Sequence, residues 1–124
     1  MAPSHNPASA VHEIAPRVLR ERIQSGEQLT LVDVREPHER SLCAIAVPGS
    51  VSDLFIPMRE IPPQFEVLKE ALRRGPLVVY CHHGIRSRAV AEWLADRGLA
   101  GIMNLGGGID AWSREADPAV PRYA

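Results

Sequence analysis

One stretch of the chain constrains its fold more than any other, because a strand, a tight loop and a helix follow one another directly. Leu77 to Tyr80 is a short apolar run rich in β-forming side chains, which is typical of a buried strand. Cys81 to Gly84 predicts a tight loop, since glycine adopts backbone conformations that other residues avoid. A helical pattern then runs from Ser87 to Arg97, and Gly98 ends it. The stretch therefore places a cysteine at the carboxyl end of a strand, just before a helix.

The rest of the chain alternates between strand and helix patterns. Strands are predicted at 11–14, 29–34, 51–56 and 102–105, and helical segments at 16–26, 37–42, 64–74 and from 109 onward. The strand at 29–34 is nearly continuously apolar, as in a sheet covered on both faces. This alternation predicts an α/β domain with a mainly parallel sheet. Ligand sites in such sheets lie beyond the carboxyl ends of the strands, where Cys81 and Arg35 fall.

Length and charge narrow the classes of protein that fit the sequence. The chain has 124 residues, enough for one domain with its own core, and 45% of them are hydrophobic. Lysine and arginine number 14 against 15 aspartate and glutamate, so the chain lacks the positive charge typical of a nucleic-acid surface. No apolar run approaches the length of a membrane span. We therefore expect neither a nucleic-acid nor a membrane partner.

Composition along the chain predicts the domain boundaries and the compartment. We expect residues 1–10 to form a flexible tail, residues 11–116 to form the domain, and residues 117–124 to form a C-terminal tail packed on its surface. The first residues lack the basic and apolar regions of a secretory signal, which favours a cytoplasmic location. In a reducing cytoplasm the two cysteines, Cys43 and Cys81, are expected to be free thiols.

Cys81 is the strongest candidate for a reactive group. A free cysteine is commonly a small buried hydrophobic residue, but the loop after Cys81 is polar and needs solvent or an anion. Unpaired N–H groups and the helix dipole favour an anion at the start of the following helix. A thiol there is expected to lose its proton more readily, and the thiolate is the reactive form. Arg86 is poorly placed at this helix end unless an anion lies beside it, so the stretch predicts a nucleophile in an anion-binding loop.

The two histidines of the loop admit several roles. His82 and His83 are consecutive and are expected to point in different directions, and no further spaced ligand pair accompanies them. We therefore expect no metal site. The sequence leaves open whether one histidine hydrogen-bonds a substrate or acts as a local base, or whether both are polar loop residues.

Three other side chains have structural interpretations. Asp33 and Arg35 are interpreted as an ion-paired set beside the site rather than as groups that touch the substrate. Cys43 has apolar neighbours, which favours a place in the core over a role in resolving an oxidised or persulfurated Cys81.

Four motifs, in order along the chain, resemble the rhodanese-like domain family. They are Leu31 to Pro37 (LVDVREP), Val47 to Ser50 (VPGS), Cys81 to Ser87 (CHHGIRS) and Asn104 to Trp112 (NLGGGIDAW). Each motif alone is modest, but the ordered set is highly specific and spans most of the chain. The chain is similar in particular to small, single-domain bacterial rhodaneses with a His-His-Gly loop. It departs from many members at 44–47, where Ala-Ile-Ala-Val replaces a Gly-His-Ile sequence before the Pro-Gly turn.

The resemblance implies a mainly parallel five-stranded sheet flanked by helices on both faces, and a sulfurtransferase activity that needs no cofactor. In the family, the loop cysteine takes sulfane sulfur from thiosulfate or a persulfide donor and passes it, as a cysteine persulfide, to cyanide or a thiol. By position, Cys81 is the nucleophile and Arg86 would hold an anionic donor. The terminal sulfur would be held by the backbone amides of His82, His83, Gly84, Ile85, Arg86 and Ser87. The implied partners are a small-molecule donor and acceptor, or a sulfur-accepting protein.

Two other function classes share this kind of loop. Phosphatases of the cell-division-cycle type and related arsenate reductases have a similar fold, but their loop places the arginine six positions after the cysteine. Here Arg86 is five positions after Cys81, and a shorter ring should hold a single sulfur better than a phosphoryl group. Rhodanese-like domains also occur as non-catalytic or relay modules that bind a partner protein, and loss of the cysteine usually marks the inactive ones. Cys81 is present, which favours transfer through a persulfide.

Overall fold

The structure is a computed structural model, and it describes residues 11–124. Its strands are β1 (His12–Ile14), β2 (Leu29–Asp33), β3 (Val51–Phe55), β4 (Leu77–Tyr80) and β5 (Ile102–Leu105). Its helices are α1 (Pro16–Gln24), α2 (Pro37–Leu42), α3 (Phe65–Ala71), α4 (Ile85–Asp96) and α5 (Gly108–Glu115). Short 3₁₀ turns, η2 (Met58–Glu60), η3 (Pro62–Gln64) and η4 (Leu72–Arg74), connect β3 to β4 through α3.

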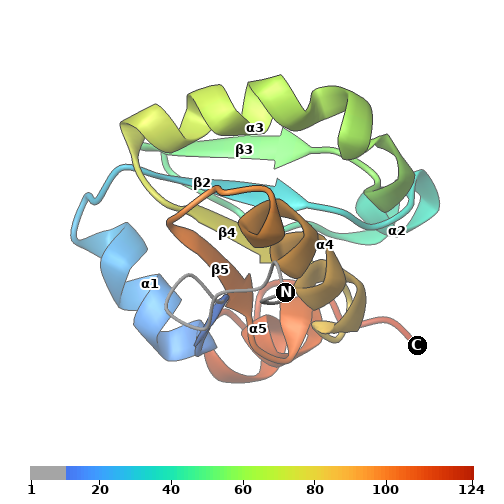
Figure 1. Cartoon of the computed structure of the whole chain (residues 1–124). Helices are drawn as coiled ribbons and strands as arrows, with labels where there is room; N and C mark the ends of the chain where they lie inside the picture. The colour runs from blue at the N-terminus through green and yellow to red at the C-terminus, as the bar shows by residue number, and fades with distance from the viewer. Residues whose placement is uncertain (1–10) are drawn as a thin grey trace.

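The five strands of the described chain form one sheet in the order β1-β5-β4-β2-β3, and every neighbouring pair is parallel (Figure 1). β4 is the central strand, between β5 and β2, and all of its residues are buried. Its carboxyl end therefore meets the ends of two neighbouring strands. The predicted α/β class and the parallel sheet are confirmed, and β1 lies at one edge of the sheet.

Two apolar clusters, one on each face of the sheet, form the core. Along β4, Val78 and Tyr80 point into the cluster that contains α1 and α5, while Leu77 and Val79 point into the cluster that contains α3 and α4. This alternation is the two-residue period of a strand, and it explains why β4 is apolar throughout. Cys81 continues the second set, so its side chain lies on the α4 face. The expected helices on both faces are confirmed.

The structure corrects two predicted helix boundaries. The helix predicted from Ser87 begins two residues earlier, at Ile85, because Gly84 takes a positive φ of +95° and caps it. The helix predicted at 64–74 is α-helical only from Phe65 to Ala71, and 3₁₀ turns extend it at both ends.

The predicted tails have different outcomes. The N-terminal tail, residues 1–10, lies outside the described residues. In the segment 117–124, Val120 is buried against the α1–α5 cluster, and Tyr123 reaches the carboxyl edge of the sheet. No helix within residues 11–124 is both long enough and apolar enough to cross a membrane.

Candidate active site

Cys81 lies directly after β4, and the loop that follows turns two backbone amides, those of Gly84 and Ser87, toward the sulfur. The side chain is almost fully buried, with 1% of the residue exposed. Its Sγ accepts hydrogen bonds from the backbone N–H of Gly84 at 3.1 Å and of Ser87 at 3.4 Å. The Ser87 hydroxyl lies 3.3 Å from the same sulfur. The predicted cysteine at an amide-lined helix start is thus present in the geometry, with the first turn of α4 facing it.

Glycines explain how the loop holds this shape. The turn before α5 packs against the loop, where the N–H groups of Ile109 and Asp110 donate to the carbonyls of Cys81 (2.9 Å) and His82 (3.1 Å). Gly108 makes this approach possible, because a Cβ there would lie 2.6 Å from the Cys81 carbonyl oxygen and closer still to that of His82. The chain folds this way because only a residue without a side chain fits between the two backbones.

Ser87 and Asn104 form a polar support beneath the sulfur. Both are buried, and the Ser87 hydroxyl donates to Asn104 Oδ1 at 2.6 Å. The Asn104 amide group in turn donates to the Gly84 carbonyl at 3.1 Å and to the Glu13 carboxylate at 3.0 Å. A hydroxyl has one proton and two lone pairs, so Ser87 can accept from the Cys81 thiol or, by rotating, donate to a thiolate. Asn104 lies on β5, so this support ties the loop to the neighbouring strand.

Arg86 is held by an internal carboxylate. Its guanidinium makes two bonds to Glu39 on α2, from Nη1 to Oε1 at 2.7 Å and from Nη2 to Oε2 at 2.9 Å. The Tyr123 hydroxyl donates to Oε2 of the same carboxylate at 2.8 Å. The hydrogen bonds from Arg86 lower the pKa of Glu39 to about 2, while burial raises the pKa of Tyr123 to about 12. Glu39 is therefore ionised and Tyr123 protonated at neutral pH. We call Arg86, Glu39 and Tyr123 the arginine clamp.

Asp33 and Arg35 form the ion pair that the sequence predicts. Both side chains are fully buried, and Nη2 of Arg35 lies 2.8 Å from the Asp33 carboxylate. Arg35 also donates to the Cys43 carbonyl at 2.7 Å and to the Tyr123 hydroxyl at 3.1 Å. Burial disfavours its charge, but the bonds to Asp33 and Tyr123 outweigh this and raise the pKa of Arg35. Through its bonds to the Cys43 carbonyl and the Tyr123 hydroxyl, Arg35 links the end of α2 to Tyr123 and so helps to position that hydroxyl in the arginine clamp.

The loop histidines do not diverge as the sequence predicts. The rings of His82 and His83 stack with their centroids 3.8 Å apart, and the Tyr123 ring stacks on His82 at 3.9 Å. The Nε2–H of His82 must donate to the Tyr123 carbonyl at 3.0 Å, because a carbonyl oxygen cannot donate. Burial and the neighbouring His83 lower the pKa of His82, which favours a neutral ring. His82 therefore anchors the C-terminal segment to the loop.

Asp110 brings a third potential metal ligand close to the two histidines. Within residues 11–124, the ligand atoms of His82, His83 and Asp110 lie within 4.8 Å of one another. The sequence contains no further spaced ligand pair, but the fold brings this single carboxylate beside the two histidines. The Asp110 carboxylate is, however, bound by Arg122 at 2.9 Å and by Arg114 at 3.3 Å. These two cations oppose a metal ion at this position, and the expected absence of metal stays a prediction.

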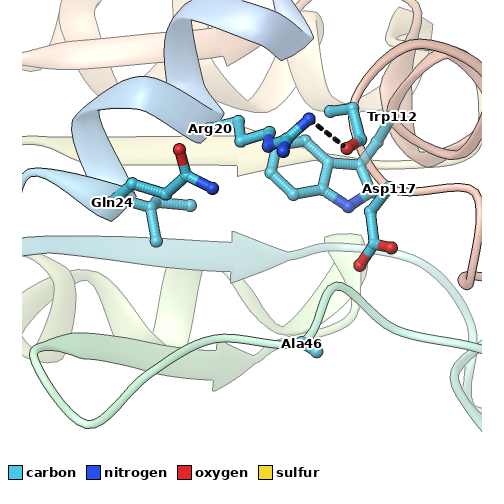
Figure 2. A pocket seen from close by; sticks show the side chains of 7 residues that line it. Arg20, Gln24, Ala46, Trp112 and Asp117 are labelled. Carbon is cyan, nitrogen blue, oxygen red and sulfur yellow. Dashed lines mark hydrogen bonds between the residues drawn. The ribbon is translucent and has the colours of Figure 1, made fainter.

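Cys43 and the pocket between α1 and α5 lie outside the Cys81 loop. Cys43 is a free, partly buried residue that packs against the α1–α5 cluster, and its sulfur lies 3.9 Å from Arg35 Nη1. A pocket of about 270 Å³ between α1 and α5 is lined by Arg20, Trp112 and Asp117 among others (Figure 2). In it, Arg20 donates to the Ala116 carbonyl at 3.1 Å, so this guanidinium is engaged with the backbone. Cys81 does not line this pocket.

Sequence reasoning missed Glu39, Asn104 and Tyr123 as parts of the site. Glu39 had a signal, because Arg86 at a helix start needs an anion and Glu39 follows another strand of the sheet at the same edge. Asn104 had a weaker one, as a polar residue in an apolar strand. Nothing in the local sequence predicts that Tyr123 contacts the loop.

Comparison with known proteins agrees with this geometry. The family model of the rhodanese-like domain matches residues 15–115. The chain belongs to the rhodanese-like domain family. This rhodanese-like domain is 34% identical to a sulfurtransferase of Allochromatium vinosum, over 89% of this chain and 95% of that protein. It is 32% identical to the thiosulfate sulfurtransferase GlpE of Actinobacillus pleuropneumoniae, over 90% of this chain and 94% of that protein.

Relatives of other lengths and solved structures extend the comparison. This rhodanese-like domain is 31% identical to the adenylyltransferase and sulfurtransferase MOCS3-1 of Zea mays, but it spans only 26% of that protein. Among solved structures, a rhodanese-related protein from Thermoplasma volcanium has a TM-score of 0.71 and 32% identity, with 90% of this chain and 99% of that chain covered. The sulfurtransferase names of its relatives support a transferase activity.

Proposed function

We propose that this rhodanese-like domain transfers sulfane sulfur from thiosulfate or a persulfide donor to a thiol or cyanide through a persulfide on Cys81. The observation that carries the proposal is the position of the Cys81 sulfur, which faces the amides of Gly84 and Ser87 at the start of α4. The name of the A. pleuropneumoniae relative, thiosulfate sulfurtransferase, supports thiosulfate as a donor.

The first half-reaction loads the cysteine. The Cys81 thiolate attacks the outer sulfur of thiosulfate, a bond forms between the two sulfurs, and the S–S bond within thiosulfate breaks. Sulfite leaves with the electron pair, so the charge of minus three before the step equals the charge after it. The amides of residues 82–87 would then hold the terminal sulfur of the persulfide.

The second half-reaction transfers the terminal sulfur from the Cys81 persulfide to the acceptor. Cyanide or a thiolate attacks the terminal sulfur, the persulfide S–S bond breaks, and the electron pair returns to Cys81 as a thiolate. The product is thiocyanate or a new persulfide. No external oxidant or reductant is consumed, because the two electrons of the broken bond stay on the cysteine sulfur. Covalent catalysis of this kind gives ping-pong kinetics.

The buried position of Cys81 supports a small donor or a donor sulfur presented at the end of a side chain. Only 1% of the residue is exposed, so a bulky reagent has little direct contact with the sulfur. A partner protein that accepts or supplies sulfur would therefore offer it on a flexible segment. That the Z. mays relative joins such a domain to an adenylyltransferase, by its name, supports a protein acceptor as one form of this proposal. Two free thiols also agree with the reducing, cytoplasmic compartment that we propose.

The test measures both the product and the intermediate. Thiosulfate with cyanide should give thiocyanate, and thiosulfate alone should add one sulfur to Cys81 in intact-protein mass spectrometry. Cys81→Ser should lose both signals. The matched control, Cys43→Ser, should keep both, because Cys43 packs against the core and not against the loop. Hydrolysis of an aryl phosphate without thiocyanate formation would replace this proposal by the phosphatase alternative.

A further inference from the structure

The charge state of the arginine clamp bears on which donors the site accepts. Arg86 is the cation that the sequence assigned to an anionic donor, yet both of its terminal nitrogens bond to Glu39. The Glu39 residue is 7% exposed, and it also takes a bond from Tyr123. The buried carboxylate thus occupies the guanidinium fork that a second anion would use.

Arg88, the other arginine in this first part of α4, does not provide an unpaired positive charge in place of Arg86. It lines a hollow together with Gly84 and Ile85, but its guanidinium contacts the carboxylates of Glu13 at 2.7 Å and Glu92 at 3.2 Å. Both arginines of the loop and of the first turn of α4 are therefore matched with carboxylates. Backbone amides and the helix start remain to attract an anion, and these are directed at the Cys81 sulfur itself.

We propose that Glu39 determines donor specificity: by neutralising Arg86, it makes the site favour monoanionic donors, such as thiosulfonates and persulfides, over dianionic thiosulfate. This inference rests on the proposed sulfur transfer through Cys81. A donor must bring its charge close to a thiolate, so every added negative charge raises the barrier unless a free cation offsets it. Because the ionised Glu39 is bonded to Arg86, the charge of Arg86 is already neutralised before the donor binds.

Two donors that differ in charge but transfer the same sulfur atom test the effect of donor charge alone. Thiosulfate carries two negative charges, and methanethiosulfonate carries one, with a methyl group in place of an oxygen. In the second case the Cys81 thiolate attacks the outer sulfur, the S–S bond breaks, and methanesulfinate leaves with the electron pair, so the total charge of minus two is conserved. Both donors leave the same persulfide on Cys81, and intact mass reports it.

Glu39→Gln is the decisive variant, because it frees the charge of Arg86 and keeps the size of the side chain. The wild type should show a higher kcat/KM for methanethiosulfonate than for thiosulfate. The variant should shift the ratio toward thiosulfate by at least about fivefold, or roughly 1 kcal/mol at 1.4 kcal/mol per factor of ten. The ratio is the readout because a merely disordered Arg86 would lower both values together.

Matched variants separate local charge from other effects. Glu66→Gln makes the same change in net charge at an exposed position on α3, and it should leave the donor ratio unchanged. Arg86→Gln should shift the ratio away from thiosulfate, and the double variant with Glu39→Gln should return it toward the wild-type value. If Glu39→Gln alone does not fold, the double variant compared with Arg86→Gln carries the same test.

Three results would overturn the inference. A donor ratio that Glu39→Gln does not change would show that the clamp does not select charge. An equal shift in Glu66→Gln would assign the effect to the net charge of the whole domain. If neither donor adds sulfur to Cys81 in the folded wild type, the proposed function itself fails, and the inference fails with it.

Discussion

Gly108→Ala tests whether the turn before α5 holds the catalytic loop in place. The control is Gly98→Ala, because both glycines have a positive φ, +63° at Gly108 and +91° at Gly98. At Gly98 an added Cβ would meet nothing within 4 Å, whereas at Gly108 it would meet the carbonyl groups of Cys81 and His82. Both variants therefore place a side chain at a positive φ, and only Gly108→Ala also brings a Cβ against the loop backbone.

The expected magnitudes follow from these contacts. A side chain at a positive φ costs about 1–2 kcal/mol, and this is the whole expected effect of Gly98→Ala. At Gly108 the clash adds about 1–3 kcal/mol of overpacking. Separating the two backbones also weakens the bonds from Ile109 and Asp110 to the loop carbonyls, at about 1 kcal/mol each. We therefore expect Gly108→Ala to lower the free energy of unfolding by about 4–7 kcal/mol.

Urea unfolding followed by tryptophan fluorescence measures both variants, since Trp112 is buried on α5. The rate of persulfide formation on Cys81 reports the loop directly, and it should fall at least about tenfold in the folded fraction of Gly108→Ala while Gly98→Ala keeps the wild-type rate. Equal destabilisation by the two variants would refute the reasoning, because it would show that the two backbones do not touch closely.

Three further predictions concern the polar contacts of the site. The pKa of Glu39 falls from 4.5 to about 2 on folding, so its stabilisation is present above pH 4.5 and lost as the pH falls through 2. The stability gap between the wild type and Glu39→Gln, about 3 kcal/mol at neutral pH, should therefore close over this range in urea titrations, and a constant gap would contradict the assignment. Tyr123→Phe keeps the ring but removes the hydroxyl between Glu39 and Arg35, and should cost about 1–2 kcal/mol; no loss in calorimetry would mean that the hydroxyl is not needed. Ser87→Ala should lower the transfer rate about fivefold, with a smaller change in melting temperature, unless the hydroxyl plays no part at Cys81.

Local sequence patterns predicted the elements well, because each depends on neighbouring residues. The run from Leu77 to Tyr80 forms the predicted strand, the helical segment predicted at 37–42 is α2, and the glycine before α4 takes the unusual backbone conformation expected of it. The pairing of Asp33 with Arg35 was also predictable, because two side chains that are two residues apart at the end of a strand lie close together.

Contacts between distant segments could not be predicted in this way. The partner of Arg86 is Glu39, 47 residues away, and only the strand order brings α2 beside the loop. Likewise the contact of Tyr123 with the loop joins it to His82, 41 residues earlier in the chain. His82 stacks on both His83 and Tyr123, so local reasoning about two consecutive residues gave the wrong directions.

The pairing of the first strand with the last governs when a growing chain can close its site. At the usual 5–20 residues per second, β1 leaves the ribosome roughly 5–20 s before β5. During this time β1 has no partner strand, because His12 pairs with Met103 of β5. Asn104 and Tyr123, which support the loop, are made later than the cysteine they shelter. During synthesis the Cys81 thiol is therefore open to oxidants and foreign thiols, and we expect newly made chains to depend on cellular reductants more strongly than the finished domain does.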